Sequence, residues 1–160
     1  MNELHANTLL HNRRYAIQKT LGQGGFGITY LAYDNVNRRH VAIKEFFMKE
    51  LCNRKGKTHH MSVPSTGSRK LVDKFRAKFL KEANTIANLS HPNIIKIYDI
   101  FEENATAYYA MEYISGGSLA DLLEKEPDKR FCETDALHYL RKVAGALNYI
   151  HMLGINNLDI

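Results

Sequence analysis

The sequence contains little cysteine, and its two cysteines fit neither a metal site nor a redox motif. Cys52 and Cys132 lie 80 positions apart, and neither belongs to a C-x-x-C pair or to a spacing typical of zinc ligands. This argues against a disulfide-based secreted scaffold and predicts a reducing, cytoplasmic compartment. No stretch approaches the 18 apolar residues of a membrane helix, and the first 14 residues lack the apolar centre of a signal peptide.

An excess of positive charge is confined to one region. Residues 54–81 contain nine lysines and arginines and one acidic residue, whereas the rest of the chain is net acidic although the whole carries +5. A basic stretch of this kind most often forms a solvated helix face, and a docking site for an acidic partner is the alternative. Nucleic-acid binding through this segment is the third and least favoured alternative, and we do not expect it.

The main motif is a glycine-rich turn between two apolar stretches. Gly22, Gly24 and Gly27 form a G-x-G-x-x-G pattern, and glycines at this spacing let backbone N–H groups approach an anion closely. A dinucleotide-binding fold would need a helix here, but residues 28–33 are β-branched and aromatic and predict a strand. A P-loop would need a lysine where Ile28 stands. Neither of these two phosphate-binding folds therefore fits.

A lysine and a glutamate outside this turn each lie at an apolar position and each need a partner of opposite charge. Lys44 lies within the apolar run of residues 41–47, where an unpaired charge is costly. Glu82 falls at helical spacing from Phe75, Phe79 and Ile86, which places it along a predicted apolar stripe. A carboxylate in that position needs a cation. We therefore predict an ion pair between the strand ammonium of Lys44 and the helix carboxylate of Glu82.

The order of elements predicts an α+β fold. Five strands are expected at residues 14–21, 28–34, 40–47, 94–101 and 106–113, in one antiparallel sheet with a single helix from about residue 71. Residues 1–12 are expected to be a polar lead-in, and residues 48–69 a long surface loop. Residues 13–113 would then form one lobe. Residues 114–160 would begin a second, helical lobe, with helices ending near Leu123 and spanning residues 134–153.

These motifs, in this order, resemble the N-terminal part of the protein kinase family, in particular bacterial Ser/Thr kinases of the eukaryotic type. The resemblance rests on the glycine loop, Lys44 in its strand, Glu82 in the helix, the His-Pro-Asn stop at residues 91–93 and the stretch 111–113. It implies a five-stranded lobe with one αC helix, followed by a hinge and an incomplete helical lobe. It also implies an ATP site and transfer of the γ-phosphate of ATP to protein hydroxyls, with Mg²⁺ as the cofactor.

The resemblance also implies roles for particular residues. Lys44 would hold phosphates and Glu82 would hold Lys44, while Asp159 would be the catalytic base. The remaining ATP contacts implied by the family are Leu21, Gly22, Gln23, Gly24, Gly25, Phe26, Gly27, Thr29, Ala42, Met111, Glu112, Ile114 and Ser118. Among these, Met111 would be the gatekeeper, and the backbone of Glu112 and Ile114 would bond the adenine edge. The Mg²⁺ ligands of the family would lie beyond residue 160, so no metal ligand is predicted here.

The chain departs from the family pattern near its last residue. Asn157 and Leu158 precede Asp159 where the family has His and Arg, so control through an arginine that reads activation-loop phosphorylation is not expected. Because the metal ligands are missing, we expect residues 1–160 alone to be inactive. The alternative is a pseudokinase-like module that binds nucleotide or a partner without catalysis.

Overall fold

The computed structural model describes residues 2–54 and 58–155, and these divide into two compact units. The first unit comprises the chain up to Asn88 together with Lys96–Tyr113. The second comprises Leu89–Ile95 and the residues from Ile114 onward. The segment 89–95 therefore leaves the first unit and joins the helical residues that follow position 113.

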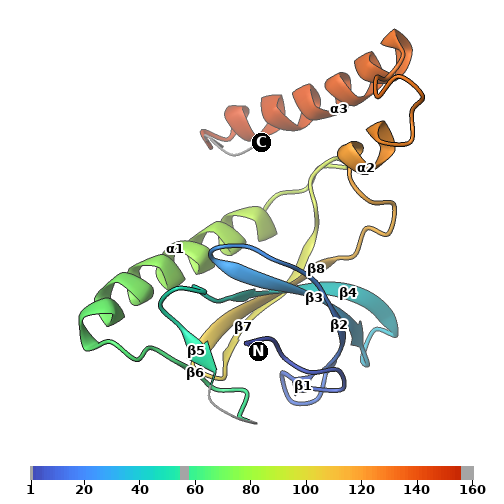
Figure 1. Ribbon diagram of the computed structural model, residues 1–160. Coiled ribbons are helices and arrows are strands. Elements are labelled where there is room, and N and C mark those ends of the chain that lie inside the picture. Colours follow the sequence, from blue (N-terminus) through green and yellow to red (C-terminus); the bar gives the residue numbers. More distant parts are fainter. Residues whose placement is uncertain (1, 55–57, 156–160) are drawn as a thin grey trace. The chain divides into compact units, whose positions relative to one another are not determined.

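A curled antiparallel sheet forms the first unit (Figure 1). Its strands are β1 (Leu9–Leu10), β2 (Tyr15–Gln23), β3 (Gly27–Asp34), β4 (Arg39–Phe46), β7 (Ile97–Glu103) and β8 (Thr106–Glu112). They are ordered β1-β2-β3-β4-β8-β7. The predicted antiparallel sheet is confirmed, with six strands in place of five. Alternation of apolar and polar residues made the five longer strands predictable.

The additional strand lies in the segment that was expected to be a polar lead-in. β1 pairs with β2, with Leu10 opposite Tyr15. Leu4 and Leu10 are both buried in the core of the first unit. The segment expected to be only a polar lead-in thus contributes a strand and two core residues to the first unit. Isolated leucines among polar residues give no periodic pattern, and only the sheet that they cover makes them core residues.

The expected long loop at residues 48–69 is also structured. It contains the small hairpin β5 (Asn53–Arg54) and β6 (Met61–Ser62), followed by the 3₁₀ helix η1 (Thr66–Ser68). Cys52 and Met61 are buried in the same core as the leucines of the N-terminal segment. The backbone N–H of Met61 donates to the carbonyl of Asn104, in the turn between β7 and β8, at 2.7 Å. The segment thus packs onto the folded unit at a few buried residues, while most of its described residues lie outside regular elements.

The predicted helix is confirmed as α1 (Arg69–Ala87), the green helix in Figure 1. Val72 and Ala83 are its buried residues. Phe79 is half-buried and packs on the sheet, with its ring centroid 5.7 Å from that of Phe46 on β4 and 5.0 Å from that of Tyr109 on β8. The apolar stripe read from the sequence therefore faces the sheet, and the basic residues of the helix lie mostly outside it.

The second unit contains α2 (Leu119–Leu123) and α3 (Glu133–Met152), close to their predicted bounds. The segment 89–95 is attached to α3 through Tyr149, whose hydroxyl accepts a hydrogen bond from the N–H of Ser90 at 3.2 Å and whose ring stacks on His91. Gly154, just past α3, has a φ of 71°, as expected of a glycine that stops a helix. No helix among the described residues is long and apolar enough to cross a membrane.

Candidate functional site

The glycine-rich turn is the tip of the β2–β3 hairpin, closed by a hydrogen bond from the N–H of Gly24 to the carbonyl of Gly27 at 2.9 Å. A Cβ added at Gly22, Gly24 or Gly25 would meet no atom of the described structure within 4 Å. At Gly27 it would lie 2.8 Å from the carbonyl oxygen of Glu45 on β4. Gly27 is thus required by strand packing, while the other three leave the backbone of the turn open to a ligand.

Strand register brings the predicted lysine beneath this turn. Lys44 on β4 pairs with Thr29 on β3 and with Tyr109 on β8, and Ala42 pairs with Met111. Directly paired residues project from the same face of an antiparallel sheet, as do residues two apart on one strand. Thr29, Ala42, Lys44 and Met111 therefore share one face. The Cε atom of Lys44 lies 3.7 Å from the position that a Cβ of Gly27 would occupy.

Tyr109 links this face to α1. The ammonium nitrogen of Lys44 lies 5.8 Å from the centroid of the Tyr109 ring, which also packs on Phe79 of α1. Burial raises the pKa of the Tyr109 phenol, the positive charge of Lys44 lowers it, and the negative charge of Glu82 raises it. The charges of Lys44 and Glu82 thus both act on one phenol, on the face of the sheet that α1 covers.

The predicted ion pair between Lys44 and Glu82 is not formed in this structure. Among the described residues, no nitrogen–oxygen contact within 4.0 Å joins the two, and Glu82 is exposed. The expectation that Glu82 lies on the buried stripe is therefore wrong. The stripe runs through Ala83, and a neighbouring helical residue is rotated by about 100° from it, which places Glu82 at the edge of the covered face.

The other predicted ATP contacts are divided between the first and the second unit. Leu21 and Phe26 are exposed in the β2–β3 hairpin, and the ring of Phe26 stacks on Phe75 of α1 with centroids 5.2 Å apart. The N–H of Glu112, at the end of β8, donates to the carbonyl of Lys96 at 2.9 Å. Ile114 and Ser118 belong to the second unit, and Asp159 lies outside the described residues.

Ser118 has a structural role that was not predicted from the sequence. It is the N-cap of α2: its hydroxyl accepts a hydrogen bond from the N–H of Asp121 at 3.1 Å and donates to the carboxylate of that residue at 2.7 Å. The N–H of Ser118 donates to the same carboxylate at 2.7 Å. This reciprocal arrangement is a capping box.

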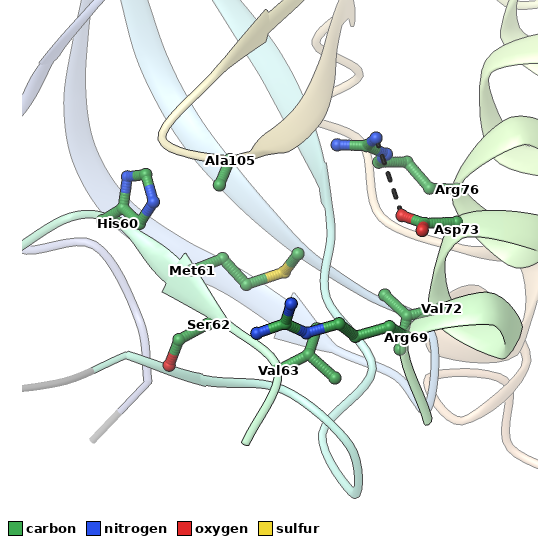
Figure 2. A pocket seen from close by; sticks show the side chains of 9 residues that line it. All are labelled: His60, Met61, Ser62, Val63, Arg69, Val72, Asp73, Arg76 and Ala105. Atoms are coloured by element: carbon green, nitrogen blue, oxygen red, sulfur yellow. Dashed lines mark ion pairs between the residues drawn. The ribbon is translucent and has the colours of Figure 1, made fainter. Parts of the chain in front are cut away.

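A pocket of about 360 Å³ lies between α1, β6 and the β7–β8 turn (Figure 2). Its lining residues are His60, Met61, Ser62, Val63, Arg69, Val72, Asp73, Arg76 and Ala105. None of the described residues predicted to bind ATP is among them. Arg76 is paired with Asp73 and Glu102, each at 3.7 Å, so its guanidinium is already partly neutralised. The pocket is thus a feature separate from the glycine turn and Lys44.

The residues present fit a nucleotide better than a metal ion. An open glycine backbone beside a lysine is suited to phosphate oxygens, because both supply N–H donors. In the described part of the chain, no group of three or more His, Cys, Asp and Glu side chains could hold a metal ion. Mg²⁺ prefers carboxylate oxygens and phosphates, which the glycine turn and Lys44 do not supply.

Comparison with known proteins agrees with this geometry. A family model described as the protein kinase domain matches residues 15–160. A probable serine/threonine-protein kinase of Clostridium acetobutylicum is 31% identical over 153 residues, which are 96% of this chain and 20% of the relative. The serine/threonine-protein kinase PknD of Chlamydia trachomatis is 31% identical over 157 residues, covering 92% of this chain and 15% of the relative.

A solved structure, the apo form of PpkA-294, superposes with a TM-score of 0.87 at 30% identity. The match covers all of this chain and 56% of that one. The chain thus spans 20% and 15% of the length of these two curated relatives and 56% of the solved structure. With a family model matched from the first long strand to the last residue, this chain belongs to the protein kinase family.

Proposed function

We propose that the chain is the ATP-binding portion of a Ser/Thr protein kinase, which transfers the γ-phosphate of ATP to hydroxyl groups of proteins. The observation on which this rests is the position of Lys44, whose side chain reaches 3.7 Å from the Cβ position of Gly27 beneath the open glycine turn. Backbone N–H groups and an ammonium then converge where a triphosphate would lie. The Ser/Thr kinases among the relatives support the choice of acceptor.

In this proposal each described residue has a limited role. The turn around Gly24 and Gly25 donates backbone hydrogen bonds to phosphate, and Lys44 holds the charge of the α- and β-phosphates. Ala42 and Met111, on the same face as Lys44, contact the adenine ring. Mg²⁺, when bound in the complete domain, would neutralise charge on the phosphates. Asp159 is proposed as the catalytic base on the family pattern alone.

Glu82 is proposed to support Lys44 when nucleotide is bound. Both charges act on Tyr109, and Lys44 on β4 and Glu82 on α1 both have long side chains that can change rotamer to meet. The pairing would fix the ammonium of Lys44 at the phosphates and so favour the bound state. Residues 1–160 taken by themselves would bind nucleotide under this proposal without useful phosphoryl transfer.

A pseudokinase-like module is the second candidate, and one observation favours it. Glu82 is exposed and makes no ion pair with Lys44 in the described structure, as expected of a site that binds without catalysis. Phosphorylation of a generic protein substrate by the complete protein would support the kinase. Nucleotide binding without such transfer would support the second candidate. A reducing, cytoplasmic location is also proposed. The two cysteines, Cys52 and Cys132, are both free, which agrees with such a compartment.

The test of the proposed site is the binding of a fluorescent ATP analogue to Lys44→Met. A charge-assisted hydrogen bond contributes about 1.5–3 kcal/mol, which corresponds to a roughly 10- to 100-fold loss of affinity. Lys49→Met is the matched control, because it removes an exposed lysine just after β4. Equal affinity of wild type and Lys44→Met would refute the phosphate role of Lys44.

A further inference from the structure

A buried carboxylate lies directly beside the lysine of the proposed site. Glu45 follows Lys44 on β4, and its side chain is 0% exposed. It accepts hydrogen bonds from the hydroxyls of Tyr30 at 2.7 Å and Tyr108 at 3.0 Å. It also forms an ion pair with the guanidinium of Arg54. A carboxylate buried among apolar residues is costly unless it is paired and hydrogen-bonded, so Arg54 is essential to this arrangement.

Arg54 is itself almost fully enclosed, with 3% of its side chain exposed. The guanidinium of Arg54 donates to the carbonyl of His59 at 2.8 Å and to the carbonyl of Asn2. The backbone N–H of Arg54 donates to the side-chain oxygen of Asn2 at 3.2 Å. The N–H of Leu4 donates to the hydroxyl of Tyr30 at 3.2 Å. The N-terminal segment and the β5–β6 hairpin thus meet at this one ion pair.

The backbone on either side of Glu45 contacts the glycine turn. The carbonyl oxygen of Glu45 is the atom that a Cβ at Gly27 would strike at 2.8 Å. Two positions later, the N–H of Phe47 donates to the carbonyl of Phe26 at 3.1 Å. This part of β4 therefore supports both the tip of the hairpin and the lysine beneath it.

Strand geometry connects the two faces. Successive side chains of a strand point to opposite faces, so Glu45 points into the core while Lys44 points toward the proposed phosphate site. Fixing Glu45 at three hydrogen-bond partners fixes the backbone from which Lys44 projects. The covering segments include Asn2 and Leu4, which lie before the residues matched by the family model.

We propose that Arg54 is a positioning residue of the nucleotide site: through Glu45 it secures the N-terminal segment and the β5–β6 hairpin to the strand that presents Lys44 and holds the glycine turn. The inference rests on the proposed function, in which Lys44 binds phosphate. It assigns a role in ligand binding to residues 2–10, 49–54 and 58–62, which contain none of the predicted ATP contacts.

The test compares Arg54→Met with Arg14→Met in the complete protein. Arg14 is a matched control because it also pairs with a buried carboxylate, that of Asp34 at 3.2 Å, and with Asp99 at 2.9 Å. That cluster lies at the opposite end of β2 and β3, where Tyr15 pairs with Asp34. Arg54→Lys is included as a milder variant, because it keeps the charge and loses the bond from the guanidinium to His59.

Two quantities are measured for each variant at a temperature where it is folded: the affinity for a fluorescent ATP analogue, and amide hydrogen exchange at residues 24–27 and 47. Coupling through packed contacts typically reaches about tenfold in affinity. We therefore expect Arg54→Met to weaken binding about tenfold and Arg54→Lys by less. We expect faster exchange at the glycine turn in both. Arg14→Met should lower the melting temperature comparably while leaving binding and exchange at the turn unchanged.

The proposal is overturned if Arg54→Met and Arg14→Met change binding and exchange in equal proportion to their loss of stability, since Arg54 would then be an ordinary stabilising residue. Failure of the proposed function has a different signature: wild type and Lys44→Met would bind the analogue equally. In that case exchange at the turn, measured without nucleotide, still decides whether Arg54 holds this strand.

Discussion

Two glycines of the same turn are expected to respond to alanine in opposite ways. At Gly27 the new methyl would lie 2.8 Å from the carbonyl oxygen of Glu45. That neighbour is backbone within a paired strand, so it cannot rotate away. At Gly25 the methyl would meet no described atom within 4 Å. The structure therefore separates a steric requirement for glycine from a ligand-binding requirement within one loop.

The magnitudes follow from this difference. Overpacking against a fixed neighbour costs about 1–3 kcal/mol, which corresponds to a fall in melting temperature of about 2–12 °C for a chain of this size. Gly25→Ala should be neutral or stabilise by up to about 1 kcal/mol, because alanine reduces the entropy of the unfolded chain. Its methyl would instead stand where phosphate must approach the backbone, so nucleotide affinity should fall.

Thermal unfolding with and without an ATP analogue measures both effects. Gly27→Ala should melt lower than wild type without ligand. Gly25→Ala should melt at or above the wild-type temperature without ligand, and it should show a smaller increase on adding the analogue. Equal melting temperatures for the two variants would refute the packing argument. An unchanged ligand-induced shift in Gly25→Ala would refute the phosphate role of the turn.

Two further predictions concern Asp34 at the end of β3 and Ser118 at the start of α2. Burial raises the pKa of Asp34, but hydrogen bonds from Arg14 and Asn37 outweigh it and lower the pKa from 3.8 to about 2. The folded pKa is thus below the unfolded one, so about 2 kcal/mol of stability is present above pH 4 and is lost as the pH falls toward 2. In Asp34→Asn the free energy of unfolding should therefore depend less on pH between 4 and 2. An unchanged pH dependence of this free energy would contradict the argument. Ser118→Ala removes the N-cap of α2, whose hydroxyl bonds Asp121, and should destabilise that helix by about 0.5–2 kcal/mol. Amide exchange in residues 119–123 measures this, and unchanged protection there would show that the cap contributes nothing.

Most of the sheet and all three α-helices could be predicted because their signals are local. Strands β2, β3 and β4 are close in sequence, and their alternating residues and short turns fix the register that places Lys44 opposite Thr29. Helix α1 has a clear apolar stripe, and its buried residues Val72 and Ala83 lie on it. For these elements the pattern within one segment already specifies which face is buried.

The segments that were mispredicted depend on distant partners. Leu4 and Leu10 have no periodic neighbours, and they become core residues only because a sheet is present beneath them. Arg54 stands in a polar, basic stretch that reads as a loop, and its partner Glu45 lies on another strand. Nothing in the neighbouring sequence indicates that an arginine in such a stretch pairs with a buried carboxylate. Composition alone therefore favours solvent exposure for it.

The wrong expectation for Glu82 shows the limit of a spacing argument. Its offsets from Phe75 and Phe79 place it near the apolar stripe, yet a residue at the edge of that stripe is exposed. Spacing fixes the angle around a helix, whereas burial depends on how that helix is rotated against the sheet. Phe79, in contact with Phe46 and Tyr109, sets that rotation here.

Adjacent charges on β4 then explain why a lysine can be held in an apolar strand at all. Lys44 and Glu45 project to opposite faces, so the strand presents a cation on the face beneath the glycine turn and is anchored through an anion on the other face. Glu45 has Arg54 and two tyrosine hydroxyls as partners, whereas Lys44 has no ion-pair partner within 4.0 Å among the described residues. A strand secured through Glu45 on one face can leave the half-buried ammonium of Lys44, on the other face, available to a ligand. Substituting Glu45 should for this reason affect nucleotide binding although its side chain points away from the site.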